Sequence, residues 1–183
     1  MENKLILYIA MSLDGYIAEK DGGIGFLDET PGPSPDLGYE EFYSSLQAMI
    51  LGGKTYRQIK TELSPEQWPY EGMPCYVCTR RQHPHDPNVQ FMSLPPGRRL
   101  LELIFREHSG AVWLVGGGEI VRCFMDENLI DEYYIYVMPA VLGDGIPLFP
   151  AGFPKAALTL KSCKSIGEIV ELVYQRGMPH CQT

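Results

Sequence analysis

The 183-residue sequence has no apolar run that approaches the ~20 residues needed to span a bilayer. Its apolar segment at residues 5–11 has neither a basic leader nor a cleavage site, so it does not read as a secretory signal. Positive charge is also scarce, because 15 lysine and arginine residues stand against 23 aspartates and glutamates, giving a net charge of −8. Such a chain repels phosphate backbones and anionic membranes over long range. We therefore expect a cytoplasmic protein whose partners include neither nucleic acid nor membranes.

The five cysteines form no pattern typical of a disulfide-rich or zinc-binding protein. An odd number in a chain of this length indicates reduced thiols. Cys75 and Cys78 have the spacing of a CxxC motif, but residues 74–79 read as a strand, in which side chains three positions apart point to opposite faces. No second CxxC occurs in the sequence, so we expect no metal site.

Hydrophobic residues make up 45% of the chain and charged residues 21%, as in an average soluble domain. A chain of this length builds one hydrophobic core of ordinary size. The sequence shows no internal repeat and no domain linker. It therefore predicts a single domain over residues 1–183.

Short apolar runs alternate with helical patterns along most of the chain. Strands are predicted at residues 5–10, 48–51, 74–79, 111–115 and 132–138. Helices are predicted at residues 39–47, 54–59, 98–108 and 119–127. Two further strands, 157–163 and 168–175, predict a C-terminal β-hairpin. The expected fold is an α/β three-layer sandwich with a central mixed, mainly parallel sheet.

The long segment 12–38 is rich in glycine, proline and aspartate and is predicted to be a functional loop.

Two glycine-rich turns, residues 52–55 and 116–119, each connect a predicted strand to a predicted helix. Glycine lets a ligand approach the backbone, and helix N-termini beyond the carboxyl ends of strands attract phosphate. Neither turn completes a standard motif: Ala48 replaces the first glycine of a Walker pattern, and Val121 the last residue of a Rossmann pattern. Each turn alone is explained equally well by a tight strand-to-helix connection. Two on one sheet favour a dinucleotide that contacts both.

The ordered motifs of the chain resemble a known family. Residues 114–120 (LVGGGEI), then 129–133 (LIDEY) and 139–149 (PAVLGDGIPLF), resemble the C-terminal reductase domain of the bifunctional riboflavin-biosynthesis deaminase-reductase, within the dihydrofolate reductase superfamily. Residues 10–18 resemble the opening Ser-Leu-Asp-Gly motif of that family, and residues 50–56 resemble its second-strand turn.

This resemblance implies a dihydrofolate reductase-like fold and an NADPH-dependent reductase that transfers hydride to a pteridine- or pyrimidine-like heterocycle. It implies cofactor contacts at both glycine turns and after the third strand, at Gly52, Gly53, Lys54, Thr55, Thr79, Arg80, Arg81, Gly116, Gly117, Gly118 and Glu119. Independently, two adjacent arginines after a strand are suited to pair with a 2′-phosphate, although a solvated loop explains them equally well.

One position departs from the family pattern. Relatives usually carry arginine where this chain has Gly53, and the substitution removes a charge expected to help hold the cofactor phosphates. A non-catalytic or degenerate nucleotide- or heterocycle-binding member of the same fold is therefore the alternative. A third hypothesis, an ATP-dependent phosphotransferase, lacks the first P-loop glycine and a clear Mg²⁺-holding acid.

Hydride transfer to an imine also requires a proton donor, and a carboxylate whose pKa is raised in a partly apolar cleft suits that role. The candidates are Asp14, after the first strand, and Asp36, before the first helix. Their structural alternatives are an Asp-Gly turn residue and a helix N-cap. Ser12 is a candidate for orienting the substrate. Tyr39 and Tyr43 are candidates for stacking on a flat ring, unless they only fill the core.

The C-terminal hairpin and the aromatic strand 132–138 present an apolar sheet surface. By analogy with the family, we expect a second subunit to cover it. The sequence therefore predicts a homodimer.

Overall fold

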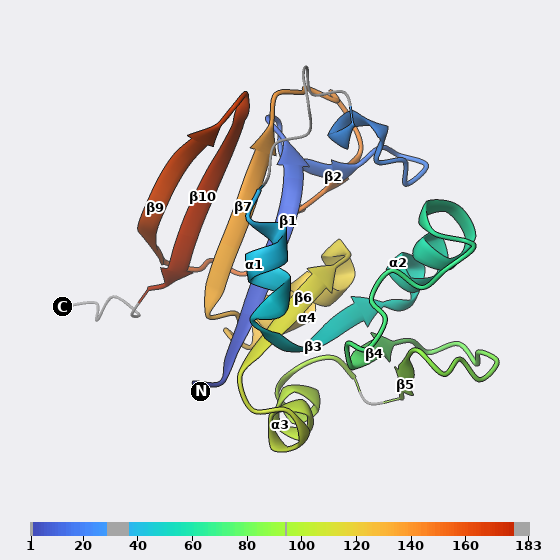
Figure 1. The fold of residues 1–183 in the computed structure, drawn as a ribbon. Helices are drawn as coiled ribbons and strands as arrows, with labels where there is room; N and C mark the ends of the chain where they lie inside the picture. The colour runs from blue at the N-terminus through green and yellow to red at the C-terminus, as the bar shows by residue number, and fades with distance from the viewer. Residues whose placement is uncertain (1, 29–36, 94, 178–183) are drawn as a thin grey trace.

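The structure is a computed structural model that describes residues 2–28, 37–93 and 95–177. Its central sheet contains β1 (Lys4–Ser12), β3 (Leu46–Gly52), β4 (Cys75–Cys78), β5 (Gln90–Met92), β6 (Ala111–Gly116), β7 (Glu132–Met138), β9 (Leu158–Ile166) and β10 (Ile169–Arg176). The eight strands lie in the order β5-β4-β3-β6-β1-β7-β10-β9 (Figure 1). A separate two-stranded ladder joins β2 (Tyr16–Ala18) to β8 (Ile146–Pro147).

The strands from β5 to β7 run parallel to one another. β10 is antiparallel to both of its neighbours, β7 and β9. The predicted mixed, mainly parallel sheet and its C-terminal hairpin are therefore confirmed. Because β1, β3, β4 and β6 are parallel, the segments that follow them all emerge at one edge of the sheet, which we call the carboxyl edge.

Within the described residues, four α-helices cover the sheet as the two outer layers of the predicted sandwich. They are α1 (Tyr39–Ser44), α2 (Gly53–Gln58), α3 (Arg98–Glu107) and α4 (Gly118–Asp126). One core cluster contains Leu100 and Ile104 of α3 and Phe124 of α4, and the other contains Tyr56 of α2 with Phe42 of α1 packed against it.

The central strand β1 is buried on both faces. Its residues Leu5 and Leu7 belong to the first cluster and Ile6 belongs to the second, as the alternation of side chains along a strand requires.

The two CxxC cysteines lie on opposite faces of the sheet, as predicted. Cys75 belongs to the cluster beneath α1 and α2, whereas Cys78 belongs to the cluster beneath α3 and α4. Burial raises the pKa of each thiol to about 12. Both side chains are therefore protonated core residues at neutral pH.

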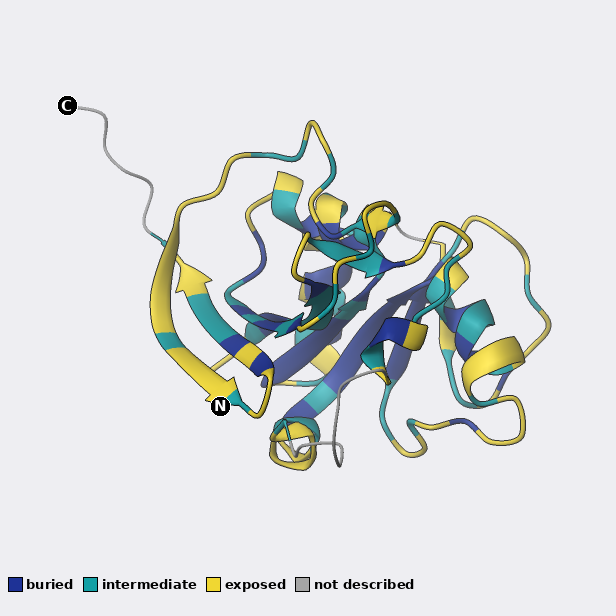
Figure 2. Ribbon diagram, turned by 90° about the horizontal axis from the view of Figure 1, so that it is seen from above, coloured by how far each residue is buried: buried dark blue, intermediate teal, exposed yellow. Residues whose placement is uncertain are grey.

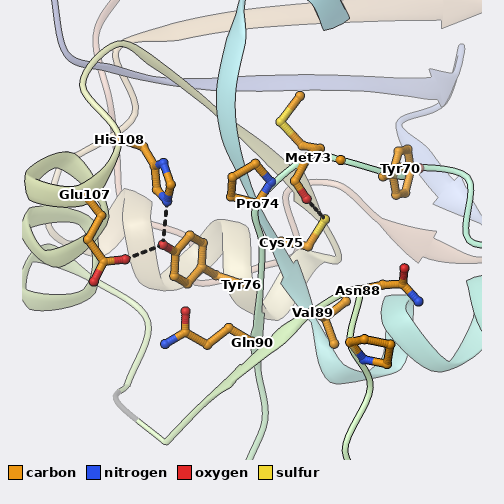
Figure 3. A pocket seen from close by; sticks show the side chains of 12 residues that line it. Tyr70, Met73, Pro74, Cys75, Tyr76, Asn88, Val89, Gln90, Glu107 and His108 are labelled. Carbon is orange, nitrogen blue, oxygen red and sulfur yellow. Dashed lines mark hydrogen bonds between the residues drawn. The ribbon is translucent and has the colours of Figure 1, made fainter.

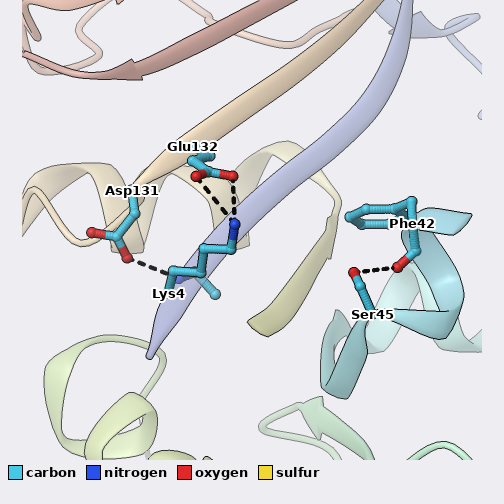
Figure 4. Close-up of polar contacts among 6 residues, drawn as sticks. Lys4, Phe42, Ser45, Asp131 and Glu132 are labelled. Atoms are coloured by element: carbon cyan, nitrogen blue, oxygen red, sulfur yellow. Dashed lines mark hydrogen bonds and ion pairs between the residues drawn. The ribbon is translucent and has the colours of Figure 1, made fainter. Parts of the chain in front are cut away.

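Polar contacts fix the amino ends of β1 and β7 beside each other (Figure 4). The Lys4 Nζ lies 3.2 and 3.0 Å from the two carboxylate oxygens of Glu132, and the Leu5 N–H donates to Asp131 Oδ2 at 2.8 Å. Figure 4 also shows the Ser45 hydroxyl donating to the Phe42 carbonyl oxygen at 2.6 Å, at the end of α1.

Three expectations about local structure need correction. The helix predicted at residues 39–47 ends at Ser44, because Leu46 begins β3 and is buried there. The predicted loop 12–38 contains β2 and a short 3₁₀ turn, Gly25–Leu27. After α2, a π-helical turn at Ile59–Leu63 extends the helix beyond its predicted end.

Among the described residues, no helix is long and apolar enough to cross a membrane. β9 lies at one edge of the sheet and is exposed along nearly all its length, in contrast to the buried central strands (Figure 2).

Candidate functional site

The two glycine turns lie side by side at the carboxyl edge. They follow the neighbouring strands β3 and β6, which pair in parallel. The Gly117 N–H donates to Thr55 Oγ1 at 3.1 Å, and Lys54 Nζ lies 3.3 Å from Glu119 Oε1. Two segments more than 60 residues apart in the sequence therefore form one surface.

The glycines of these turns are present for different reasons. A Cβ atom on Gly53 would lie 2.9 Å from Thr79 Oγ1 and 3.0 Å from Thr79 Cβ, which is closer than real side chains approach. By contrast, a Cβ atom on Gly117 or Gly118 would meet its nearest neighbour at 3.6 or 3.5 Å, an ordinary contact. Packing inside the chain therefore disfavours a side chain at 53, whereas a Cβ atom would fit at 117 and 118 without a clash.

Gly117 and Gly118 stand at the start of α4. No side chain caps this helix among the residues that the structure describes. Gly116, just before it, has φ +117°, a conformation that favours glycine. The arrangement combines a glycine-rich strand-to-helix turn with the positive end of a helix dipole, which suits an anionic group.

The segment after β4 reaches the same edge. Thr79, packed against Gly53, accepts a hydrogen bond from the Arg81 N–H at 3.1 Å through its Oγ1, which also lies 3.3 Å from His83 Nε2. Arg80 and Arg81 are exposed. The structure thus brings the predicted arginines and both glycine turns to the carboxyl edge of the sheet.

Asp14 holds two loops together. Its carboxylate accepts hydrogen bonds from Ser12 Oγ at 2.6 Å, from the Gly143 N–H at 2.7 Å and from the Leu142 N–H at 3.2 Å. The bond from Ser12 is the main cause that lowers the pKa of Asp14. The expectation of a raised pKa at Asp14 is therefore wrong, and the geometry favours a loop-holding role. Asp36, the other candidate acid, lies outside the described residues.

Ser12 is completely buried, and its hydroxyl both donates and accepts a hydrogen bond within the chain. It donates to Asp14 and accepts from the Tyr16 N–H at 3.0 Å. These bonds show that Ser12 holds the turn after β1 together. Its contact with a substrate stays a prediction.

Tyr39 and Tyr43 belong to an aromatic cluster on the inner side of α1. Their rings stack on each other at 5.7 Å, and the Tyr39 ring lies 6.1 Å from Trp113 in β6. Burial is the main cause that raises the pKa of Tyr39. Tyr39 nevertheless keeps 39% of its surface exposed, so part of the ring is available to a flat ligand. Their role in substrate binding stays a prediction.

Comparison with known proteins shows the family of this chain. The family model for the RibD C-terminal domain matches residues 3–172. The chain belongs to the RibD C-terminal domain family. That family is in general the reductase domain of RibD, which supports an oxidoreductase.

Individual relatives cover almost the whole chain. Uncharacterized protein YwjB of Bacillus subtilis (strain 168) is 43% identical over 179 residues, which are 97% of this chain and 100% of that protein. YyaP of the same organism is 25% identical and covers 94% of this chain and 95% of its own length.

Solved structures of the family have the same fold. A Shewanella sp. PV-4 protein named for riboflavin biosynthesis superposes with a TM-score of 0.80 and 26% identity, covering 97% of this chain and all of its own. RibD of Acinetobacter baumannii gives a TM-score of 0.73 at 19% identity, covering 96% of this chain but 58% of RibD. The dihydrofolate reductase-like architecture expected from the sequence is thereby confirmed.

Two buried carboxylates were missed by sequence reasoning. Asp86, between β4 and β5, is 8% exposed, and Glu171 in β10 is 7% exposed. The Tyr136 hydroxyl lies 2.9 Å from Glu171 Oε2, and Lys164 Nζ lies 3.5 Å from Glu171 Oε1. In the sequence, Glu171 could have been noticed as a charged residue within an apolar strand of the hairpin. Asp86 could have been noticed from the Asp-x-Asn spacing that is typical of an Asx turn.

A cavity of about 450 Å³ lies at the opposite, amino edge of the sheet (Figure 3). In it the Tyr76 hydroxyl donates to Glu107 Oε2 at 2.6 Å and lies 3.0 Å from His108 Nε2. These residues stand at the start of β4 and at the end of α3, whereas both glycine turns stand at the carboxyl ends of strands. The cavity is therefore separate from the candidate cofactor surface.

Proposed function

We propose that this member of the RibD C-terminal domain family is an NADPH-dependent reductase that transfers hydride to a pteridine- or pyrimidine-like heterocycle. The observation that supports the proposal most is the pair of glycines at 117 and 118, at the start of α4, where a Cβ atom would make only ordinary contacts, in a family that generally uses NADPH. Packing inside the chain leaves room for a Cβ atom at both positions, so it does not by itself require glycine there. The close approach of a phosphate group does.

In this proposal, the backbone N–H groups at the start of α4 hold the pyrophosphate of the dinucleotide, and Lys54 supplies a positive charge from the neighbouring turn. Arg80 and Arg81 pair with the 2′-phosphate, because guanidinium groups form paired hydrogen bonds with phosphate oxygens. When bound, the reduced nicotinamide supplies the hydride.

The heterocycle would be accommodated beside the exposed part of Tyr39 in the aromatic cluster. A flat ring gains offset stacking there. Asp14 keeps the β1 turn and the loop at residues 139–145 together, so it shapes the carboxyl edge without transferring a proton.

A titration of the purified protein with NADPH, and separately with NADH, tests the proposal. Trp113 and Trp68 are buried on the face of α1 and α2, and their fluorescence reports binding by quenching and energy transfer. We expect saturable binding that favours NADPH, followed by NADPH oxidation with a member of a pterin and pyrimidine panel. Saturable binding with no oxidation would favour a non-catalytic member of the fold. No binding up to millimolar concentration would overturn the proposal.

A further inference from the structure

The segment that carries Arg80 and Arg81 is anchored to the fold by a buried acid, Asp86. Residues 79–89 connect β4 to β5, and because these strands are parallel, the segment must return from the carboxyl edge to the amino edge. It contains neither helix nor strand. Such a connection is held in place by its contacts rather than by regular backbone hydrogen bonding.

Asp86 joins the segment to Tyr56 and Lys60 and also binds Asn88 within the segment. It accepts hydrogen bonds from the Tyr56 hydroxyl at 2.8 Å, from the Asn88 N–H at 3.0 Å and from Asn88 Nδ2 at 2.9 Å. Lys60 Nζ lies 3.2 Å from the same carboxylate. Burial opposes the charge of Asp86, but these bonds outweigh it and lower the pKa of Asp86 to about 2. The acid therefore stays ionised and joins the segment to the helix that begins at Gly53.

Tyr56 also contacts the segment nearer to the arginines. The His83 ring meets Tyr56 edge-on at 5.7 Å and stacks on Phe91 at 4.8 Å. His83 Nε2 in turn lies 3.3 Å from Thr79 Oγ1, which receives the Arg81 N–H. A continuous set of contacts thus leads from the buried carboxylate to the backbone of Arg81.

We propose that Asp86 is a positioning residue that holds the arginine-bearing segment on α2 and thereby sets the preference for a dinucleotide with a 2′-phosphate. The inference rests on the proposed function, because it assigns Arg80 and Arg81 to that phosphate. Ordering a loop before binding removes an entropic cost from binding. Only the ligand that the loop contacts benefits, so the advantage belongs to NADPH and not to NADH.

The test compares two buried acids. Asp86→Asn removes the charge that anchors the segment, and Glu171→Gln is the matched control, since Glu171 is buried to the same extent but lies in β10, toward the other end of the sheet. We expect Asp86→Asn to reduce the ratio of NADPH to NADH affinity by about tenfold. Glu171→Gln should leave that ratio unchanged, whatever either variant does to thermal stability.

A second readout does not need the cofactor. Trypsin cleaves after Arg80 and Arg81, so the rate of cutting there reports how often the segment opens. We expect Asp86→Asn to raise that rate about tenfold relative to cleavage after Lys155, which is exposed and lies in neither helix nor strand, and Glu171→Gln to leave the relative rate unchanged.

The outcomes separate the two proposals. If the wild-type protein binds neither dinucleotide, the proposed function fails, and faster trypsin cleavage in Asp86→Asn would then show only that the acid anchors the segment. If the wild-type protein prefers NADPH and Asp86→Asn keeps the same affinity ratio, the positioning role is wrong. An equal fall in the ratio for Glu171→Gln would also overturn it, because the effect would then be a general loss of stability.

Discussion

Gly53 occupies a position where a single methyl group changes the packing of the site. Its Cβ would press on the side chain of Thr79, which is itself held through Arg81 and His83. The resemblance implies arginine at this position in relatives. In the proposed function, the phosphate contacts therefore come from other residues, among them Lys54, Arg80 and Arg81, which follow β3 and β4 at the same edge.

We predict that Gly53→Ala lowers the free energy of unfolding by about 1–3 kcal/mol, because overpacking forces Thr79 to move. Urea denaturation measures the change. The companion variant Thr79→Ala removes the oxygen that lies 2.9 Å from the new Cβ, so the double variant should cost less than the sum of the two single changes. Strict additivity of the two changes would show that Thr79 does not constrain position 53.

Asp86 gives the protein a defined sensitivity to acid. Its pKa is lowered to about 2, below the ordinary value of about 3.9, so the ionised form stabilises the fold at neutral pH. This contribution, about 2 kcal/mol, is complete above pH of about 5 and is lost as the pH falls through about 2. Urea denaturation from neutral to acid pH should therefore show the stabilities of the wild type and Asp86→Asn converging as acid is added. Parallel curves would contradict this account.

At the scale of elements, a substitution in the first turn of α4 should affect dinucleotide affinity and stability differently. We predict that Gly118→Ala leaves thermal stability unchanged or raises it, since alanine is the better helix former and its Cβ would make an ordinary contact with the Pro147 carbonyl oxygen. The same methyl group would stand at the helix N-terminus, where the proposal places the pyrophosphate. Dinucleotide affinity should therefore fall by about tenfold or more. Affinity equal to that of the wild type would place the pyrophosphate elsewhere.

The sequence predicted long elements well and short ones poorly. The strand expected at residues 132–138 is β7 with the same bounds, because a continuous apolar run buried on both faces leaves little ambiguity. β2, β5 and β8 contain only two or three residues, and their pairing partners, not their own pattern, define them. The helix expected at 39–47 was too long, since Leu46 continues the helical spacing although its side chain is buried in β3.

The site was predicted only in part, for a related reason. The two glycine turns were recognisable because each stands between an apolar strand and a helical pattern. What distinguishes Gly53 from Gly117 is the approach of Thr79, which follows a different strand. The partners of Asp14, Leu142 and Gly143, are 128 and 129 residues away in the sequence. The contacts that favour the structural alternative for Asp14 could therefore not be read from the sequence.

At the scale of the whole molecule, the sheet is unevenly covered. Helices pack on both faces of its parallel part, whereas β9 at the other end is exposed along nearly its entire length (Figure 2). This end presents apolar side chains to solvent, among them Leu158, Leu160 and Val170. A long exposed edge strand with apolar residues is a template for pairing with another chain. We propose that a second copy of the chain covers it in a homodimer.

The dimer predicts a specific loss on mutation. Leu160 is 53% exposed on β9, and replacing it with lysine puts a charge into the proposed contact, so Leu160→Lys should be monomeric at micromolar concentration where the wild type has the mass of a dimer. Light scattering measures the mass, and circular dichroism verifies that the hairpin still folds. Leu63, 50% exposed after α2, provides the matched control, because Leu63→Lys adds the same charge at a position outside the hairpin. A monomeric wild type would refute the dimer outright, and a dimeric Leu160→Lys would move the interface away from β9.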